Sequence, residues 1–325
     1  MRARVRYLRR VAAAYLGKGP SQLTFWHETP ETNTNAFARE PLGEYYQCFF
    51  TKADYAAHVD GDGVPLLDYR GSVGRQYNPI AIAQWGLGNW NLWRRTGDHD
   101  RRARWALAAD WLVENLTPNE HGLPVWKHHF DWEYRDTLRA GWYSALAQGQ
   151  GLSLLCRAHR ATGDDRYIDA AHAAFGAMTV STDEGGVLIR DGVDGAWLEE
   201  AVVDPPTHIL NGFVWAMWGV RDYAVAGRAR AAWALLEACE RTLRRHLPTF
   251  DCGFWSLYEQ SGTRLPMLAS PFYHGLHINQ LGITSRLLDM PDLDDCAERW
   301  RGYARNPWCR RRAFAQKVLF KVLYY

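Results

Sequence analysis

The sequence predicts an all-α main domain, an (α/α) toroid or barrel of helical hairpins preceded by a short strand-containing segment. Three observations lead to this fold class: a motif that recurs about every 65 residues, long apolar helices before each copy, and amphipathic helices after it. A chain of 325 residues can bury about three quarters of the surface that it exposes when unfolded. One large core is therefore expected.

The repeat is clearest in two segments. NLWRRTGDHDRRARWALAADWL and LLCRAHRATGDDRYIDAAHAAF share the pattern R-x-T-G-D followed by an alanine-rich run, and DYAVAGRARAAWALLEAC is a weaker third copy. Gly97, Gly163 and Gly227 mark the three copies. Many helices end with a glycine in the left-handed conformation, so each of these glycines is expected to end a helix.

Amphipathic helices follow the glycines. Apolar residues recur there at the i, i+3, i+4, i+7 spacing that buries one stripe of a helix. The stripes are Trp105, Ala108, Ala109, Leu112, Val113 and Leu116 in the first copy, and Tyr167, Ile168, Ala171, Ala174, Phe175 and Met178 in the second. We assign both stripes to the core and give them no chemical role.

The helices before the glycines are apolar nearly all round. PIAIAQWGLGNWNLW, SALAQGQGLSLLC and ILNGFVWAMWGV carry Gly, Gln and Asn among apolar residues, and SPFYHGLHINQLGITSRLL is expected to be a fourth such helix. Helices of this kind are buried on all sides. Buried inner helices that alternate with amphipathic outer helices describe a toroid.

The chain is expected to divide into a leading segment, residues 1–76, and a main domain, residues 77–325. In the leading segment, EYYQCFFTKADY and VPLLDYRG predict a few short strands that form a small strap. Both ends of the chain are basic and amphipathic, in RARVRYLRR and CRRRAFAQKVLFKVLYY. They suit a peripheral contact with anionic lipid or with a partner, or terminal helices that pack on the domain with solvated charges.

Composition narrows the functional classes. The net charge of +2 is too balanced for a dedicated nucleic-acid binder, whereas 16 Trp and 16 Tyr suit a cleft in which ring faces stack on sugars. The six cysteines show no metal-binding spacing, so buried free thiols are expected, and no metal or cofactor.

The sequence also allows a prediction of where in the cell the protein is found. No run of about 20 apolar residues could cross a membrane, and the apolar stretch VAAAYL is short for an export signal. A cytoplasmic protein is expected, peripheral at the inner membrane face if its basic ends bind lipid. A homodimer is left open.

Functional residues are expected where an outer helix leads into the next inner helix. All inner helices of a toroid run the same way, so the residues at their N-termini surround one mouth: Tyr77 and Asn78, Trp142 and Tyr143, His208 and Asn211, and His274 and His277. Free N–H groups and aligned dipoles at four helix N-termini favour a carboxylate. The substrate is therefore expected to be anionic.

A family resemblance appears at these same residues. The strings YNPIAIAQWGL, GWYSALAQGQGLSLL, LEE followed by HILNGF, and FYHGLHINQL resemble the C-terminal domain of the D-glucuronyl C5-epimerases of heparan sulfate and heparosan maturation, over roughly residues 77–288. The resemblance implies an (α/α) barrel, a polysaccharide cleft, and interconversion of D-glucuronate and L-iduronate units within the polymer.

The resemblance also implies site residues. The catalytic glutamate of the family corresponds to Glu200, with Glu199 as its neighbour and rival, and the two active-site tyrosines correspond to Tyr273 and Tyr258. Two positions depart from the family pattern. Ala201 stands where an aromatic residue is expected, and YEQSG lacks an arginine expected shortly after Tyr258.

These residue types suit the reaction. Inversion at C5 requires a base on one face of the ring and an acid on the other, and a carboxylate and a tyrosine can fill these roles. Negative charge that grows on the uronate carboxylate must also be offset. His277, Asn279 and Arg190 are candidates for this, although His277 and Asn279 could instead cap the helix.

Three other classes of carbohydrate-acting protein are compatible with the sequence. An inverting glycoside hydrolase would use an acid and a base on either side of the sugar, which Asp131, Glu133, Asp191 and Glu199 could supply. A polysaccharide lyase would share the C5 proton abstraction and then expel the O4 substituent. A glycan-binding module would have an aromatic cleft without a titratable pair.

Overall fold

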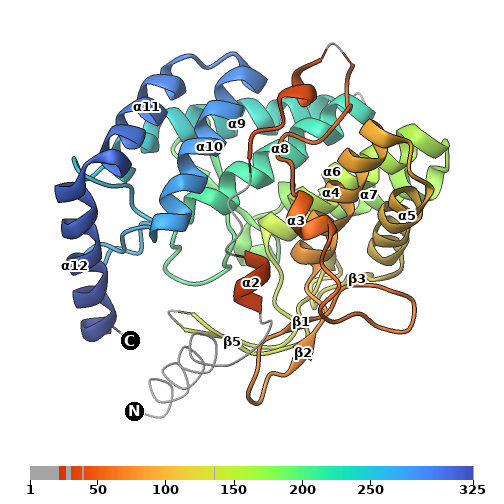
Figure 1. Cartoon of the computed structure of the whole chain (residues 1–325), viewed down its shortest axis with the longest axis horizontal. Helices are drawn as coiled ribbons and strands as arrows, with labels where there is room; N and C mark the ends of the chain where they lie inside the picture. Colours follow the sequence, from red (N-terminus) through yellow and green to blue (C-terminus); the bar gives the residue numbers. More distant parts are fainter. Residues whose placement is uncertain (1–21, 27–30, 39, 135, 228, 325) are drawn as a thin grey trace.

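The computed structural model describes residues 22–26, 31–38, 40–134, 136–227 and 229–324, so the basic segment RARVRYLRR lies outside the described residues. The predicted all-helical main domain is confirmed (Figure 1). Its inner helices are α4 (Pro79–Thr96), α6 (Ala145–Thr162), α8 (Leu210–Gly227) and α10 (Pro271–Leu288). Each is followed by an outer helix: α5 (His99–Glu114), α7 (Asp165–Thr179), α9 (Arg230–His246) and α11 (Asp292–Arg305). A further helix, α12 (Pro307–Tyr324), comes last, and no described helix is long and apolar enough to cross a membrane.

The glycines of the repeat end the inner helices, as predicted. Gly97 and Gly163 adopt φ values of 71° and 70°, and their N–H groups donate to the carbonyls of Trp93 and His159. Gly227 is the last residue of α8.

Other glycines let the inner helices approach closely. A Cβ atom on Gly149 in α6 would lie 2.5 Å from the Cα of Ala216 in α8, and one on Gly219 would overlap the backbone of Gly149. Side chains at these positions would push the two helices apart. This explains why the inner helices are rich in glycine although glycine destabilises a helix interior.

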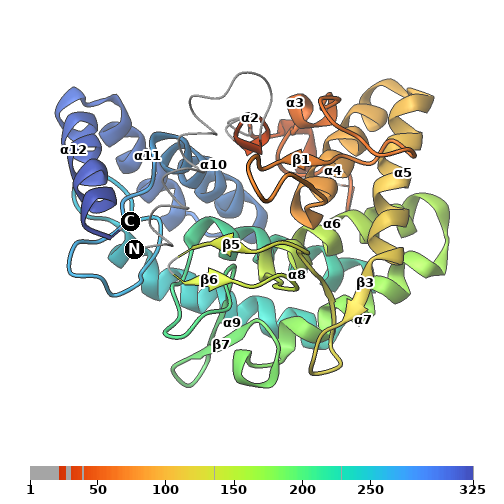
Figure 2. The ribbon, with the colours of Figure 1, turned by 90° about the horizontal axis from the view of Figure 1, so that it is seen from below.

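The strands of the described chain are short antiparallel hairpins: β1 (Leu67–Asp68) with β2 (Arg75–Gln76), β3 (Leu116–Pro118) with β4 (Pro124–Trp126), β5 (Trp132–Glu133) with β6 (Thr137–Leu138), and β7 (Leu188–Asp191) with β8 (Gly195–Leu198). The last three hairpins connect an outer helix to the next inner helix, and Figure 2 shows β5 to β7 on one side of the molecule. Short 3-10 helices are η1 (Thr34–Phe37), η2 (Thr182–Glu184) and η3 (Leu247–Phe250). The short helix α2 (Gln22–Trp26) belongs to the leading segment.

The leading segment corrects one expectation. VPLLDYRG contains strand β1, but EYYQCFFTKADY forms no strand and contains the short helix α3 (Phe50–Ala53). The physical reason is burial: every residue from Tyr45 to Phe49 is buried, whereas a strand with one solvent face would alternate.

This stretch instead fills the space between inner helices. The Gln47 side chain donates to Asn279 of α10 at 2.7 Å and accepts from the indole of Trp215 in α8 at 2.7 Å. The backbone N–H of Tyr45 donates to Asn91 of α4 at 2.6 Å. The leading segment therefore bridges the first and the last inner helices and helps to close the ring.

Candidate active site

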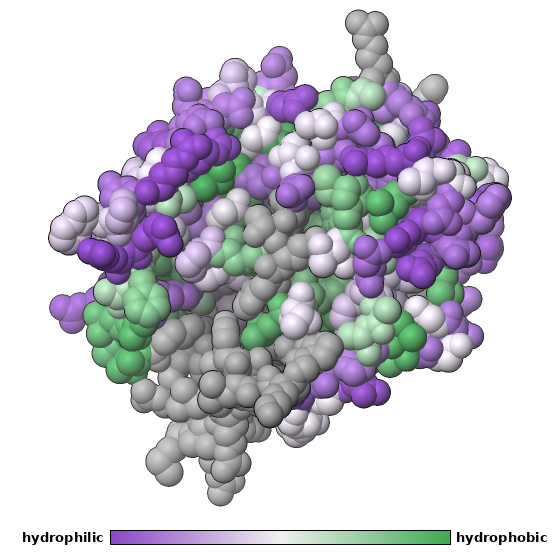
Figure 3. Space-filling model, in the orientation of Figure 1, coloured by the Kyte–Doolittle hydropathy of each residue, from purple (hydrophilic) through white to green (hydrophobic). Residues whose placement is uncertain are grey.

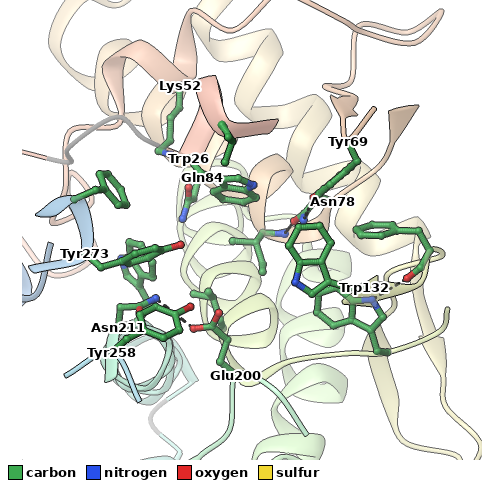
Figure 4. Close-up of a pocket in the computed structure, with 17 residues that line it drawn as sticks. Trp26, Lys52, Tyr69, Asn78, Gln84, Trp132, Glu200, Asn211, Tyr258 and Tyr273 are labelled. Carbon is green, nitrogen blue, oxygen red and sulfur yellow. Dashed lines mark hydrogen bonds between the residues drawn. The ribbon is translucent and has the colours of Figure 1, made fainter. Parts of the chain in front are cut away.

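A cavity of about 270 Å³ opens at the N-terminal ends of the inner helices (Figure 4). Residues from all four inner helices, from the links before them and from the leading segment line it. The described lining residues are Leu23, Trp26, Lys52, Tyr69, Asn78, Ile80, Gln84, Phe130, Trp132, Trp142, Leu146, Glu200, Asn211, Trp215, Tyr258, Phe272 and Tyr273. The cavity therefore lies at the mouth that the sequence predicts.

The structure divides the predicted site residues into two groups. Those that line the cavity are Asn78, Trp142, Glu200, Asn211, Tyr258 and Tyr273. Those that do not line it are Tyr77, Tyr143, Arg190, Glu199, His208, His274, His277 and Asn279. Residues that neighbour each other in sequence fall into different groups, because a helix or strand turns only some of its side chains to one side.

Three of the predicted residues outside the cavity lie in the segments that lead into the inner helices, and their side chains contact other groups. Tyr77 is 38% exposed and donates to Asp60 at 2.7 Å. The hydroxyl of Tyr143 donates to the carbonyl of Gly185 at 2.8 Å, and Arg190 is exposed on β7. Arg190 is therefore not placed to offset charge in this cavity.

The predicted residues of α10 behind Tyr273 hold the helix in place. His274 and His277 are buried and share a hydrogen-bond partner, the Ser256 hydroxyl, at 2.8 and 3.1 Å. Burial lowers their pKa values to about 4 and about 3, so both imidazoles are neutral at pH 7. Asn279 bonds to Gln47 and Thr32, in the leading segment.

The structure separates the two neighbouring glutamates. The N–H of Glu199 continues the β7–β8 ladder by donating to the carbonyl of Val187 at 2.8 Å. Strand β8 ends at Leu198, and the side chains of the two following residues have different surroundings. Glu199 is fully buried and bonds to the Nδ1 of His208, whereas Glu200 lines the cavity.

The first turn of α8 shapes the space around Glu200. The Asn211 side chain donates to the Oε2 of Glu200 at 3.3 Å (dashed in Figure 4). Next to it, the Cα of Gly212 faces the Glu200 side chain so closely that a Cβ atom there would lie 2.6 Å from the Glu200 Cβ. The sequence Asn-Gly thus supplies both a hydrogen-bond donor and the space that the carboxylate needs.

Glu200 has an unusual proton affinity. Burial in the protein raises its pKa from 4.5 to about 8, with further contributions from the negative charges of Glu199 and Glu259, and the Asn211 hydrogen bond opposes the shift. A carboxyl group with such a pKa exchanges protons near neutral pH. This is the range in which a general acid or base is most effective.

Two tyrosines lie beside this carboxylate. The rings of Tyr258 and Tyr273 meet edge to face with centroids 4.9 Å apart. In Figure 4, both hydroxyl groups point into the cavity, and that of Tyr258 points towards Glu200. Burial, and then the charge of Glu200, raises the pKa of Tyr258 well above 10, so this hydroxyl keeps its proton.

Aromatic residues form the opposite wall. Figure 4 shows Trp132 and Tyr69 on the far side of the cavity from Tyr258 and Tyr273. The ring of Tyr69 lies 4.6 Å from Phe130 and 5.4 Å from Trp132, and Trp142 donates to the carbonyl of Phe130 at 2.9 Å. A wall of ring faces suits the apolar face of a sugar.

Two polar residues of the cavity were not singled out by the sequence. Lys52, from α3, lines the cavity, and its Nζ donates to the carbonyl of Phe25 at 2.7 Å. Gln84 of α4 is fully buried and lines the cavity, and neither side-chain amide atom has a hydrogen-bond partner among the described residues. A glutamine within an apolar inner helix is a sequence feature that could have drawn attention to Gln84. The sequence alone does not show, however, whether its side chain faces the cavity.

The carboxylates considered for a hydrolase do not line the cavity. Asp131 pairs with Arg139 at 2.8 Å, and Asp191 pairs with Arg245 at 2.7 Å and bonds to His246. Glu133 accepts from Thr137 at 3.3 Å. Among the described lining residues, Glu200 is the one carboxylic acid.

A known protein family is similar to the part of the chain that contains this cavity. Residues 120–302 match the family model described as the D-glucuronyl C5-epimerase C-terminus. The matched range is more than half of the 325 residues and contains Glu200, Tyr258 and Tyr273.

Two curated proteins are similar over part of their length. D-glucuronyl C5-epimerase of Caenorhabditis elegans is 31% identical over 215 residues, which cover 61% of this chain and 34% of that protein. An uncharacterised protein of Methanocaldococcus jannaschii is 32% identical over 161 residues, which cover 48% of this chain and 50% of that protein. The matched part thus spans between a third and a half of these relatives. Among solved structures, the unsaturated glucuronyl hydrolase of Bacillus sp. GL1 aligns with a TM-score of 0.47 and 17% identity, over 69% of this chain and 61% of that chain.

Proposed function

Because the chain belongs to the D-glucuronyl C5-epimerase C-terminal family, we propose that it inverts C5 of D-glucuronate units within an acidic polysaccharide, giving L-iduronate. Heparosan, or a polymer like it, is the proposed substrate. The observation that carries the proposal is the composition of the cavity: one carboxylic acid with a raised pKa beside two tyrosine hydroxyls.

Glu200 is proposed to act as the base. In its ionised form it takes the C5 proton, and the electron pair of the broken C–H bond moves into the uronate carboxyl group. Tyr273 donates its proton to C5 from the other face, which completes the inversion. Its facing position relative to Glu200 across a bound sugar is part of the proposal.

After one turnover Glu200 holds the proton from the substrate and Tyr273 has lost one. Tyr258 is proposed to restore both groups, since its ring contacts Tyr273 and its hydroxyl points towards Glu200. It would pass one proton to Tyr273 and receive one from Glu200, and these O–H protons exchange with water between turnovers, so that C5 receives a proton from solvent. No atom is gained or lost in the cycle, as an isomerisation requires.

Lys52 and Gln84 are proposed to hold the uronate carboxylate. Lys52 is the one cationic side chain among the described residues that line the cavity, and it would offset the charge that grows on the carboxylate in the transition state. It would take the role of the arginine that the family pattern places after Tyr258. The amide of Gln84 has free hydrogen-bonding capacity in the cavity, which a sugar hydroxyl or carboxylate can use.

The cavity supports an epimerase over an inverting hydrolase. A hydrolase of that class requires a second carboxyl group about 6.5–9.5 Å from the first, with room for water between them. The described lining residues supply one carboxyl group only. A lyase would use the same first step, so the products must separate these two reactions.

The test is the content of L-iduronate in heparosan after incubation with the purified chain, measured by NMR. We expect iduronate signals to appear and to stop growing at an equilibrium mixture. Heparosan that stays pure glucuronate, when other uronate polymers also stay unchanged, would contradict the proposal.

A further inference from the structure

The last helix exposes large apolar side chains. Eleven large hydrophobic side chains are exposed among the described residues, and seven of them lie on α12. They include Trp308 at 77%, Phe314 at 72%, Leu319 at 50% and Leu323 at 58% exposed. In Figure 3, a hydrophobic area covers the part of the molecule where α12 lies.

These side chains do not belong to the face by which α12 packs on the domain. Ala313 and Phe320 are buried at 6% and 2% exposed and mark the packed face. At 100° per residue, Trp308, Val318 and Leu319 fall roughly 110–150° from the middle of this packed face. An outer helix normally turns polar residues to solvent, whereas α12 has a second apolar face whose side chains are exposed in the described part of the chain.

The same helix is strongly basic. Residues 307–324 contain five Lys and Arg and no Asp or Glu, although the whole chain has a net charge of only +2. Neither Arg310 nor Arg311 forms an ion pair with a described residue. Arg312 lies over the ring of Phe254 at 3.8 Å.

A second cavity lies along this helix. It has a volume of about 570 Å³ and combines cationic with apolar lining residues: Trp255, Ala269, Pro271, Pro307, Arg310, Arg311, Ala313, Phe314 and Lys317. Two guanidinium groups that have no ion-pair partner among the described residues, beside an aromatic ring, suit a phosphate with an apolar chain attached. This observation is separate from the exposure of the outward face.

We propose that α12 is an interfacial helix that binds an anionic phospholipid surface. Its outward apolar side chains enter the boundary between head groups and acyl chains, and Arg310 and Arg311 bind lipid phosphates. With 18 residues, the helix is about 27 Å long and lies in the plane of the membrane. This inference does not depend on the reaction proposed above.

Charge and residue type favour lipid over the other occupants. A two-fold pairing of α12 with a second copy would bring its five cations close to five more, without an acidic residue on either helix. An acidic polysaccharide would use the arginines, but it offers no apolar surface for Val318, Leu319 and Leu323. An anionic membrane satisfies both features.

The experiment is co-flotation of the purified full chain with vesicles of phosphatidylcholine alone or with 30% phosphatidylglycerol. We expect binding to the anionic vesicles at least about tenfold tighter than to the neutral ones, and weaker binding in high salt. The double variant Arg310→Gln/Arg311→Gln should lose about thirtyfold in affinity. Phe314→Ser/Leu319→Ser should lose at least about tenfold.

Two matched variants serve as controls. Trp233→Ser changes an apolar side chain that is 41% exposed on α9, and Arg301→Gln removes a cation of α11. Both should bind the anionic vesicles like the wild type, and circular dichroism should show that all variants are folded.

Three results would overturn the proposal. The first is absence of binding to anionic vesicles. The second is a wild-type dimer in solution that Phe314→Ser/Leu319→Ser converts to a monomer, which would assign the face to a second copy. The third is unchanged vesicle binding of Arg310→Gln/Arg311→Gln together with a loss of heparosan affinity, which would assign the arginines to polysaccharide.

Discussion

A methyl group on Gly212 would overlap the carboxylate of Glu200, since a Cβ atom there would lie 2.6 Å from the Cβ and 2.9 Å from the Cδ of that glutamate. The position of Glu200 therefore depends on the absence of a side chain at the third residue of α8. Glu200 and Gly212 act as a pair, although neither is conspicuous alone.

Gly212→Ala should displace the Glu200 carboxylate and lower kcat by at least about tenfold, because a misplaced base loses its alignment with the C–H bond. Helix propensity alone predicts that this substitution stabilises the folded protein, since alanine favours a helix by roughly 1 kcal/mol over glycine. Steady-state kinetics and thermal unfolding would measure the two effects. Gly176→Ala, in α7 with nothing within 4 Å of the added Cβ, is the control and should keep full kcat. If both variants have the same kcat, the close approach of Gly212 to Glu200 does not matter for catalysis.

The pKa of Glu200 predicts how its substitution changes stability with pH. The folded protein holds the Glu200 proton up to about pH 8, whereas the unfolded chain releases it near pH 4.5. The stabilisation by the protonated form is thus complete below pH 4.5 and is lost as the pH rises to 8. Because Glu200→Gln cannot lose a proton there, its Tm relative to the wild type should rise between about pH 5 and pH 8. Glu237→Gln, at an exposed position of α9, is the control for loss of a surface charge, and a flat difference for Glu200→Gln would contradict the raised pKa.

Tyr273→Phe should lower kcat by at least about a hundredfold, the usual effect of removing a positioned acid or base. Tyr258→Phe should also lower kcat, since turnover needs the proton returned. The control is Tyr143→Phe, which removes a hydroxyl that bonds to the carbonyl of Gly185 outside the cavity. That variant should keep kcat and lose only about 1 kcal/mol of stability. If Tyr273→Phe turns over like Tyr143→Phe, Tyr273 has no catalytic role.

Lys52→Met should raise KM for a glucuronate polymer by about 10- to 100-fold, the value of a charge-assisted hydrogen bond. The affinity for the carboxyl-reduced polymer should not change, because that polymer lacks the group that Lys52 is proposed to hold. Lys127→Met is the control, because Lys127 lies outside the cavity and its Nζ donates to the carbonyl of Pro118. Equal losses with both polymers would mean that Lys52 only anchors Phe25 and the local backbone.

Much of the fold could be predicted from periodicity. The apolar inner helices, the amphipathic outer helices and the glycines between them each have a local cause, so residues 79–288 matched the expectation closely. The stretch EYYQCFF did not, because its structure depends on bonds to Asn91, Trp215 and Asn279, which lie 44 to 232 residues away. No local pattern reports such contacts.

The candidate site, like the fold, could be predicted from the sequence only in part. The mouth of the toroid and its aromatic character were predictable, because helix N-termini meet there. The lining residues Lys52 and Gln84 were not, since their role depends on which face of a helix turns to the cavity. His274 and His277 illustrate the converse: they stand in a conspicuous motif with Tyr273, but they are buried behind it and bond to Ser256.

The fate of the hydrogen at C5 tests the central claim most directly. When the chain acts on heparosan in D₂O, we predict that deuterium accumulates at C5 of the uronate units while the length of the polymer stays constant. A lyase would shorten the polymer and leave an unsaturated uronate that absorbs in the near ultraviolet, and a hydrolase would release reducing ends without exchange. Cleavage without retained label at C5, or no exchange with heparosan and with other acidic polymers, would contradict the account.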